Sequence, residues 1–269
     1  MQHVSGYTFG VGFITWALSR VPHVLDTVLT YQPNCIFLSF GDPRPFADRI
    51  RRSGAKLICQ VQCLAHIREA LEAGADAIVA QGTEAGGHGA KRSTLPFIPE
   101  AADFLATHSP ETLLLGAGGI ADGRGLAAAL MLGADGVVVG TRFWATAEAM
   151  TPIGAMQRAI HATGDDTVRT RALDAIRGLS WPDGFSLRVV KNKFTEEWAD
   201  REVQALAERG RLTEAYAQAR QRQDFDLVAI IAGEYVGLIH DRPGAANILQ
   251  KMVAQAQSLL RQGAMFDFT

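Results

Sequence analysis

The sequence contains only three cysteines in 269 residues, Cys35, Cys59 and Cys63. That number is too small for the disulfide framework of a small secreted protein. Structural zinc sites usually need four cysteine or histidine ligands, and no second pair accompanies Cys59 and Cys63. We therefore expect the cysteines to pack in the core, and we expect no metal site.

Long apolar runs and long runs of one charge are also missing. The longest apolar stretch near the start, residues 9–18, includes two glycines and a threonine and is far shorter than the roughly 18 residues of a membrane-spanning helix. The first ten residues lack the basic and then apolar order of a signal peptide. The formal net charge is −2, and the most basic stretches, 48–56 and 169–178, are interleaved with acids and helix formers. The sequence thus argues against membrane and nucleic-acid partners and predicts a cytoplasmic protein.

What the sequence does contain is a series of short apolar runs separated by helical patterns. Continuous runs of this length indicate strands that are covered on both faces, as in parallel sheets. The expected strands are 9–14, 35–40, 56–61, 77–81, 113–117 and 136–140. The expected helices are about 20–31, 43–53, 64–73, 97–107 and 123–132. Strands that alternate with helices predict an α/β fold with right-handed crossovers.

A small repeat supports this organisation. The stretches SGAKLICQV at 53–61, AGADAIVAQ at 73–81 and LGADGVVVG at 132–140 share Gly-Ala, a polar residue and then an apolar strand. Glycine at this place can adopt the left-handed conformation that ends a helix. The repeat predicts one repeating α/β layer, either closed as a barrel or open and doubly wound.

The strand count and the second half of the chain set the domain prediction. A (β/α)₈ barrel has eight strands. Only six are found, so either the sheet is open or the two β-α units expected before residue 9 are absent from this chain. After about residue 143 the strand pattern stops, and a last helix at about 243–261 is expected to pack back on the sheet. We predict a barrel domain from 1–146 and 233–269, with a helical insertion at 147–232.

Two glycine-rich loops follow strands and precede helices. In parallel α/β folds, ligands bind at the carboxyl ends of the strands. The loop GAGGIADGRG at 116–125 offers bare backbone, and Asp122 can cap the next helix. The loop VVVGTRF at 137–143 follows the next strand, and neighbouring loops of this kind commonly form a phosphate site. No Gly-Lys-Ser/Thr follows, so we predict a phosphate-bearing cofactor other than a nucleoside triphosphate.

A third loop carries a histidine. In AIVAQGTEAGGHGA, residues 77–90, His88 follows Gly86 and Gly87. The glycines remove side chains that would keep a flat ligand away, and imidazole can take or give a proton near neutral pH. His88 is therefore the candidate catalytic residue, the alternative being a loop histidine with a role in the turn.

The loops AQGTEAGGHGA and GAGGIADGRGLAAALMLGADGVVVGTRFWAT resemble the nitronate monooxygenase family, formerly called 2-nitropropane dioxygenases, whose members are FMN-dependent TIM-barrel enzymes. The likeness runs from about 9 to 150 and resumes at AGEYVGLIHDRPGAANILQKMVAQA, 232–256. The resemblance implies that His88 is the catalytic base. It places FMN contacts at Gln81, Gly86, Gly118, Gly119, Gly140 and Thr141.

The resemblance also implies a reaction. An alkyl nitronate would be oxidised by dioxygen with FMN, giving a carbonyl compound and nitrite. His88 would remove the α-proton of a nitroalkane or hold a nitronate that is already anionic. The partners are then small molecules, with formation of a homo-oligomer left open.

The chain departs from the family in two places. The Ala-Pro-Met-like first strand and the Gly-Gly-Leu-Gly-like turn after the second do not occur, so residues 9–14 correspond to the third strand and we expect a shortened N-terminus. Gly12 stands where many members have asparagine. A flavin-dependent enoyl-acyl carrier protein reductase, with a similar Glu-Xaa-Gly-Gly-His loop, and a non-catalytic remnant of the family are the alternatives.

Overall fold

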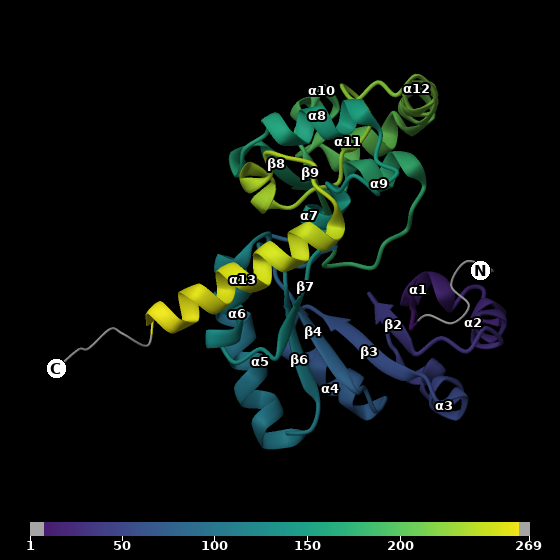
Figure 1. Ribbon diagram of the computed structural model, residues 1–269. Coiled ribbons are helices and arrows are strands. Elements are labelled where there is room, and N and C mark those ends of the chain that lie inside the picture. Colours follow the sequence, from purple (N-terminus) through teal and green to yellow (C-terminus); the bar gives the residue numbers. More distant parts are fainter. Residues whose placement is uncertain (1–7, 264–269) are drawn as a thin grey trace. The chain divides into compact units, whose positions relative to one another are not determined.

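The structure is a computed structural model that describes residues 8–263 (Figure 1). Within this range the chain forms two compact units. The first consists of residues 8–81, 95–116 and 129–137, and the second of 82–94, 117–128 and 138–263. Each unit is described here by itself.

The first unit is built on a six-stranded sheet. Its spatial order is β1-β2-β3-β4-β6-β7, which follows the order of these strands along the chain, and β1 through β4 pair in parallel. Each expected strand is present, within two residues of its predicted bounds. The strands are β1 (Gly10–Ile14), β2 (Cys35–Ser39), β3 (Lys56–Val61), β4 (Ala77–Gln81), β6 (Leu113–Ala117) and β7 (Gly136–Val138).

The predicted helices between these strands are confirmed. They are α2 (His23–Leu29), α3 (Arg44–Ser53), α4 (Leu64–Glu72), α5 (Thr94–His108) and α6 (Gly123–Met131), with a single turn, α1 (Thr15–Leu18), before α2. The repeat has the predicted conformation, since the glycines that follow three of these helices have positive φ: 80° at Gly54, 74° at Gly74 and 97° at Gly133. Each therefore ends a helix in a conformation that a side chain disfavours.

The core of the first unit lies between the sheet and its helices. All five residues of β4 are buried, which explains why its sequence is a continuous apolar run. Cys59 of β3 is buried among these side chains, and burial raises the pKa of its thiol to about 12. Over residues 8–263 no cluster of three or more metal-ligating side chains occurs. Cys59 is thus the core residue that the sequence predicted, whereas Cys35 and Cys63 are only partly buried.

The second unit contains a small antiparallel sheet that the sequence did not predict. Its order is β5 (Gly87–Gly89), β9 (Ser186–Val190) and β8 (Thr167–Thr170). The expectation that strands stop near residue 143 is wrong for 167–170 and 186–190. The rest of this region is helical, as expected, with α7 (Thr141–Trp144), α8 (Ile153–His161), α9 (Ala172–Arg177), α10 (Lys193–Trp198), α11 (Glu202–Ala207) and α12 (Arg209–Arg222). These elements form the teal and green part of Figure 1.

One face of the small sheet packs on α9 to α12. Leu173, Ile176 and Leu187 are fully buried there, with Phe194, Trp198 and Leu212 around them. Burying each of these side chains contributes roughly 1.5–3 kcal/mol. This cluster gives the helical part its own core, independent of the first unit's core.

The C-terminal helix α13 (Ala245–Gly263) is drawn in yellow in Figure 1. Ile248, Met252 and Ala256 form its buried stripe, whereas Leu259 is only partly buried. Gln255 on this helix accepts a hydrogen bond of 2.8 Å from the Gly123 N–H at the start of α6. Among the described residues, even α13 is not apolar enough to cross a membrane.

Candidate active site

The loop that follows β4 carries the candidate catalytic histidine into the small sheet. His88 is the middle residue of β5 and lies opposite Leu187 of β9, while Gly87 has φ of 81°. The predicted loop histidine is therefore held by strand pairing. Its backbone is fixed on a rigid element, as a catalytic side chain requires.

The imidazole of His88 has two close partners. Its Nε2 lies 2.9 Å from Oδ2 and 3.1 Å from Oδ1 of Asp174. Its ring stacks on Trp181 with 3.4 Å between ring centroids and 10° between planes. The side chains of His88 and Asp174 are 12% and 5% exposed. The structure thus assembles a nearly buried carboxylate, imidazole and indole.

Local sequence explains why these partners reach His88. Asp174 lies in the first turn of α9, between Leu173 and Ile176, whose burial fixes the helix. Gly178, with φ of 68°, ends α9 and turns the chain toward Trp181. Neither partner is evident from the sequence, because Asp174 lies 86 residues after His88. The one available signal was the turn-rich stretch LSWPDGF, which places an aromatic residue in a loop.

Two arginines hold the loop before β5. Arg169 of β8 donates to the carbonyl oxygens of Thr83, at 2.8 and 3.0 Å, and Ala85, at 3.1 Å. Arg188 of β9 donates to the same Thr83 oxygen at 3.0 Å and forms a 2.7 Å ion pair with Glu234. Burial, and then the nearby Arg188, lowers the pKa of Arg169 to about 10, so it stays a cation at neutral pH. Two positive charges therefore bind the polar backbone next to His88.

The glycine pair of the second predicted loop lies against the same loop. Gly118 and Gly119 have φ of 97° and 67°, a sharp turn that only glycine adopts readily. A Cβ on Gly118 would lie 2.9 Å from the Gly82 carbonyl oxygen, and one on Gly119 would lie 3.3 Å from Cβ of Glu84. Asp122 then caps α6 by accepting from the Arg124 N–H at 2.9 Å, as predicted.

A short segment after the helical part brings in the remaining predicted residues. A Cβ on Gly86 would lie 2.5 Å from main-chain atoms of Ala232 and Gly233, so the bare backbone at Gly86 allows close chain packing. The Gly233 N–H donates to Thr141 Oγ1 at 3.0 Å. Gly140 is exposed, and a Cβ there would meet no atom within 4 Å. The second unit thus brings together six of the seven predicted site residues: Gly86, His88, Gly118, Gly119, Gly140 and Thr141.

The seventh predicted residue, Gln81, belongs to the first unit. It ends β4 and accepts a 2.9 Å hydrogen bond from Nε2 of Gln62, which follows β3. Both side chains are buried, and Oε1 of Gln62 accepts no hydrogen bond within residues 8–263. The carboxyl ends of two parallel strands therefore carry an amide pair with one unused acceptor. Gln62 lies outside the three loops to which the sequence pointed.

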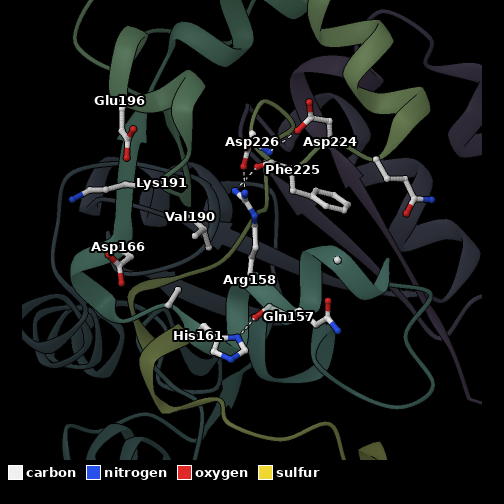
Figure 2. Close-up of a pocket in the computed structure, with 13 residues that line it drawn as sticks. Gln157, Arg158, His161, Asp166, Val190, Lys191, Glu196, Asp224, Phe225 and Asp226 are labelled. Carbon is white, nitrogen blue, oxygen red and sulfur yellow. Dashed lines mark hydrogen bonds and ion pairs between the residues drawn. The ribbon is translucent and has the colours of Figure 1, made fainter.

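A hollow of about 790 Å³ lies elsewhere in the second unit (Figure 2). Arg158 of α8 points toward Asp226, with which it forms an ion pair, and donates to the Phe225 carbonyl at 2.9 Å. Lys193 also pairs with Asp226, at 2.7 Å. None of the predicted site residues lines this hollow. The hollow is therefore distinct from the His88 site.

Comparison with known proteins identifies the family. The sequence model of the family described as nitronate monooxygenase matches residues 14–255. The nitronate monooxygenase npaC of Metarhizium robertsii is 35% identical over 93% of this chain and 74% of its own length. FabK from Thermotoga maritima has the same fold, with a TM-score of 0.82 and 24% identity over 96% of this chain and 78% of that one.

A third relative agrees in fold. The nitroalkane oxidase of Streptomyces ansochromogenes has a TM-score of 0.77 at 22% identity, over 98% of this chain and 84% of that one. Together with the six-stranded sheet, these likenesses confirm the predicted α/β barrel type, with six of its eight strands. By its sequence, the chain belongs to the nitronate monooxygenase family and is an oxidoreductase.

Proposed function

We propose that the chain is an FMN-dependent enzyme that oxidises alkyl nitronates with dioxygen, giving a carbonyl compound and nitrite. The observation that carries this proposal is His88, held by Asp174 and Trp181 next to the glycine turns at 86–87 and 118–119. A nearly buried imidazole on a rigid strand is a group that can take a proton from carbon. Family membership supports the oxidation of a nitro compound.

The residues present fit a flavin, the cofactor expected in this family. The unused acceptor of Gln62, beside Gln81, suits the N–H group of a flat polar ring. The open space at Gly140 and the left-handed turn at Gly118 and Gly119 leave main-chain groups accessible to a phosphate. We infer that the glycines of the second unit hold the phosphate of FMN, with Gly86 contributing main-chain atoms and Thr141 a hydroxyl, and Gln81 stays a predicted FMN contact. When bound, FMN would supply the electron acceptor for the oxidation.

The chain's own residues account for the proton transfer. The α-proton of a nitroalkane moves to the imidazole of His88, and the electron pair of the broken C–H bond stays on the nitronate. The resulting imidazolium can pair with the nitronate anion, as it can with a nitronate that arrives already ionised. Trp181 covers one face of the ring and keeps water from it.

The test compares two substrates that differ by one proton. Nitroethane must lose its α-proton, whereas ethyl nitronate has already lost it. We expect His88→Asn to lower kcat/KM for nitroethane by about 10²- to 10⁴-fold and to leave flavin content unchanged. His108→Asn, on the exposed end of α5, is the matched control. Nitrite release measures the rates, and turnover of nitroethane by His88→Asn at the parent rate would remove His88 as the base.

The same protein preparation tests the alternatives. Mass spectrometry of the released cofactor distinguishes FMN from other flavins. Anaerobic addition of NADPH distinguishes an enoyl reductase from a nitronate monooxygenase, because NADPH would reduce the flavin of an enoyl reductase and bleach its colour. A protein that stays colourless after addition of FMN would favour the non-catalytic remnant. The boundaries at 146 and 233, a homo-oligomeric state and a cytoplasmic location stay predictions.

A further inference from the structure

Burying the carboxylate beside His88 costs free energy. Asp174 is buried in a helix turn whose neighbours, Leu173 and Ile176, are fully buried. A buried carboxylate loses several kcal/mol of hydration and recovers it only through strong partners. Replacing such a pair by apolar residues is often neutral or stabilising. Fold stability therefore gives little reason for an acid at position 174.

The geometry shows what the carboxylate does to the ring. Both oxygens of Asp174 lie within 3.1 Å of Nε2 of His88, so the carboxylate accepts the Nε2–H. A neutral imidazole with its proton on Nε2 has its lone pair on Nδ1. The carboxylate thus selects one tautomer and one ring orientation.

The indole completes the restraint. Trp181 lies nearly parallel to the imidazole, with ring centroids 3.4 Å apart, and Phe185 packs edge-on to the indole at 6.3 Å. Rotation of the His88 ring out of its plane would collide with Trp181. When the ring takes up a proton, the positive charge would lie between a carboxylate and the face of an indole, both of which attract it.

We propose that Asp174 is the positioning residue of this enzyme: it fixes His88 in the Nε2–H tautomer and in one ring orientation, and it stabilises the imidazolium that forms. This inference rests on the proposed role of His88 as the base. In the step, the C–H bond of the nitroalkane breaks, its proton moves to the imidazole of His88, and its electron pair stays on the nitronate. Asp174 remains ionised and takes up no proton.

The first test uses the unmodified, full-length protein and needs no turnover. Nitrogen-15 NMR of histidine-labelled protein distinguishes the two neutral tautomers. We expect the resonances that His88→Asn removes to be those of an Nε2–H ring whose Nε2 proton is protected from solvent exchange. An Nδ1–H tautomer at His88 would overturn the proposal.

The second test is kinetic. Asp174→Asn presents an amide N–H that favours the opposite tautomer, so kcat/KM for nitroethane should fall by about 10²- to 10⁴-fold. The value for ethyl nitronate, which needs no proton abstraction, should change by less than about tenfold. Asp174→Glu keeps the charge and should recover part of the nitroethane rate. Asp183→Asn is the matched control, because this aspartate side chain is 97% exposed and pairs with Arg171 on the surface.

The outcomes separate the two proposals. If His88→Asn abolishes nitroethane turnover, His88 is the base. If Asp174→Asn then lowers the rates for both substrates equally, or lowers neither rate, Asp174 does not position His88. If His88→Asn itself has no effect, the proposed function fails, whatever the tautomer. Should Asp174→Asn not fold, the Asp174→Glu kinetics and the tautomer of the unmodified protein still decide.

Discussion

At the scale of single residues, the loop around His88 depends on charge placed against backbone. Carbonyl oxygens of the 82–89 loop point toward Arg169 and Arg188, and these two cations replace the hydrogen bonds that water would otherwise supply. A guanidinium can reach several carbonyl oxygens at once because its donors lie in a rigid plane. The conformation of the Glu-Ala-Gly-Gly-His motif thus depends on Arg169 and Arg188, which lie outside the motif.

This arrangement predicts a large effect for a conservative change. Arg169→Lys keeps the charge but has too few fixed donors to reach Thr83, Ala85 and Ser186 together. We expect the free energy of unfolding to fall by about 2–4 kcal/mol, because several partly buried carbonyl groups lose their partners. Urea unfolding followed by circular dichroism measures the change. Arg171→Lys, two residues away with partners on the surface, should change stability by less than about 0.5 kcal/mol.

At the scale of helices and strands, the helix-ending glycines differ in what surrounds them. Gly54 and Gly133 both have positive φ, at 80° and 97°. A Cβ on Gly54 would meet no atom within 4 Å, whereas one on Gly133 would lie 2.9 Å from Cβ of Ala102. Alanine at Gly54 therefore tests backbone strain alone, whereas alanine at Gly133 tests backbone strain together with steric overlap.

Alanine at each position makes this comparison. Gly54→Ala should lower the free energy of unfolding by about 1–2 kcal/mol, the cost of a left-handed conformation with a Cβ. Gly133→Ala should cost about 1–3 kcal/mol more, because α5 must shift to admit the methyl group. Thermal unfolding of the two variants side by side measures the difference. Equal losses would show that the Ala102 contact relaxes without cost.

The two sheets differ in how well their strands can be predicted from the sequence. The strands of the first unit were predictable from β1 to β7 because each is a short apolar run, although only β4 is buried along its whole length and β1 is partly exposed. By contrast, β8 is only four residues long with an arginine inside it, and β9 contains Arg188 between buried apolar residues. Such strands carry no apolar run. Asp174 and Trp181 could not be predicted from the sequence, because their roles depend on a contact that folding brings about across 86 residues.

At the scale of the whole molecule, the proposed cofactor should stabilise the native state. A ligand at about 100 times its Kd adds about 2.7 kcal/mol if it binds only the folded protein. For a protein of this size that corresponds to a rise in Tm of about 5–10 °C. Differential scanning fluorimetry with added FMN measures it.

Riboflavin is the matched ligand for this experiment. It has the ring of FMN and lacks the phosphate, so it should give a clearly smaller rise in Tm if main-chain groups at the glycine turns bind phosphate. Equal stabilisation by the two compounds would contradict a phosphate site at Gly118, Gly119, Gly140 and Thr141. It would leave the ring contacts of Gln81 and Gln62 as the basis of binding.

The strand order of the first unit has a consequence for folding. Every neighbouring pair in β1-β2-β3-β4-β6-β7 is also adjacent along the chain, apart from the short β5, so each pairing closes only a modest loop. Low contact order of this kind favours rapid formation, and a ribosome releases these strands one after another in the order in which they pair. The partners of His88 emerge much later. We expect a nascent chain to form the sheet of the first unit well before His88 meets Asp174 and Trp181.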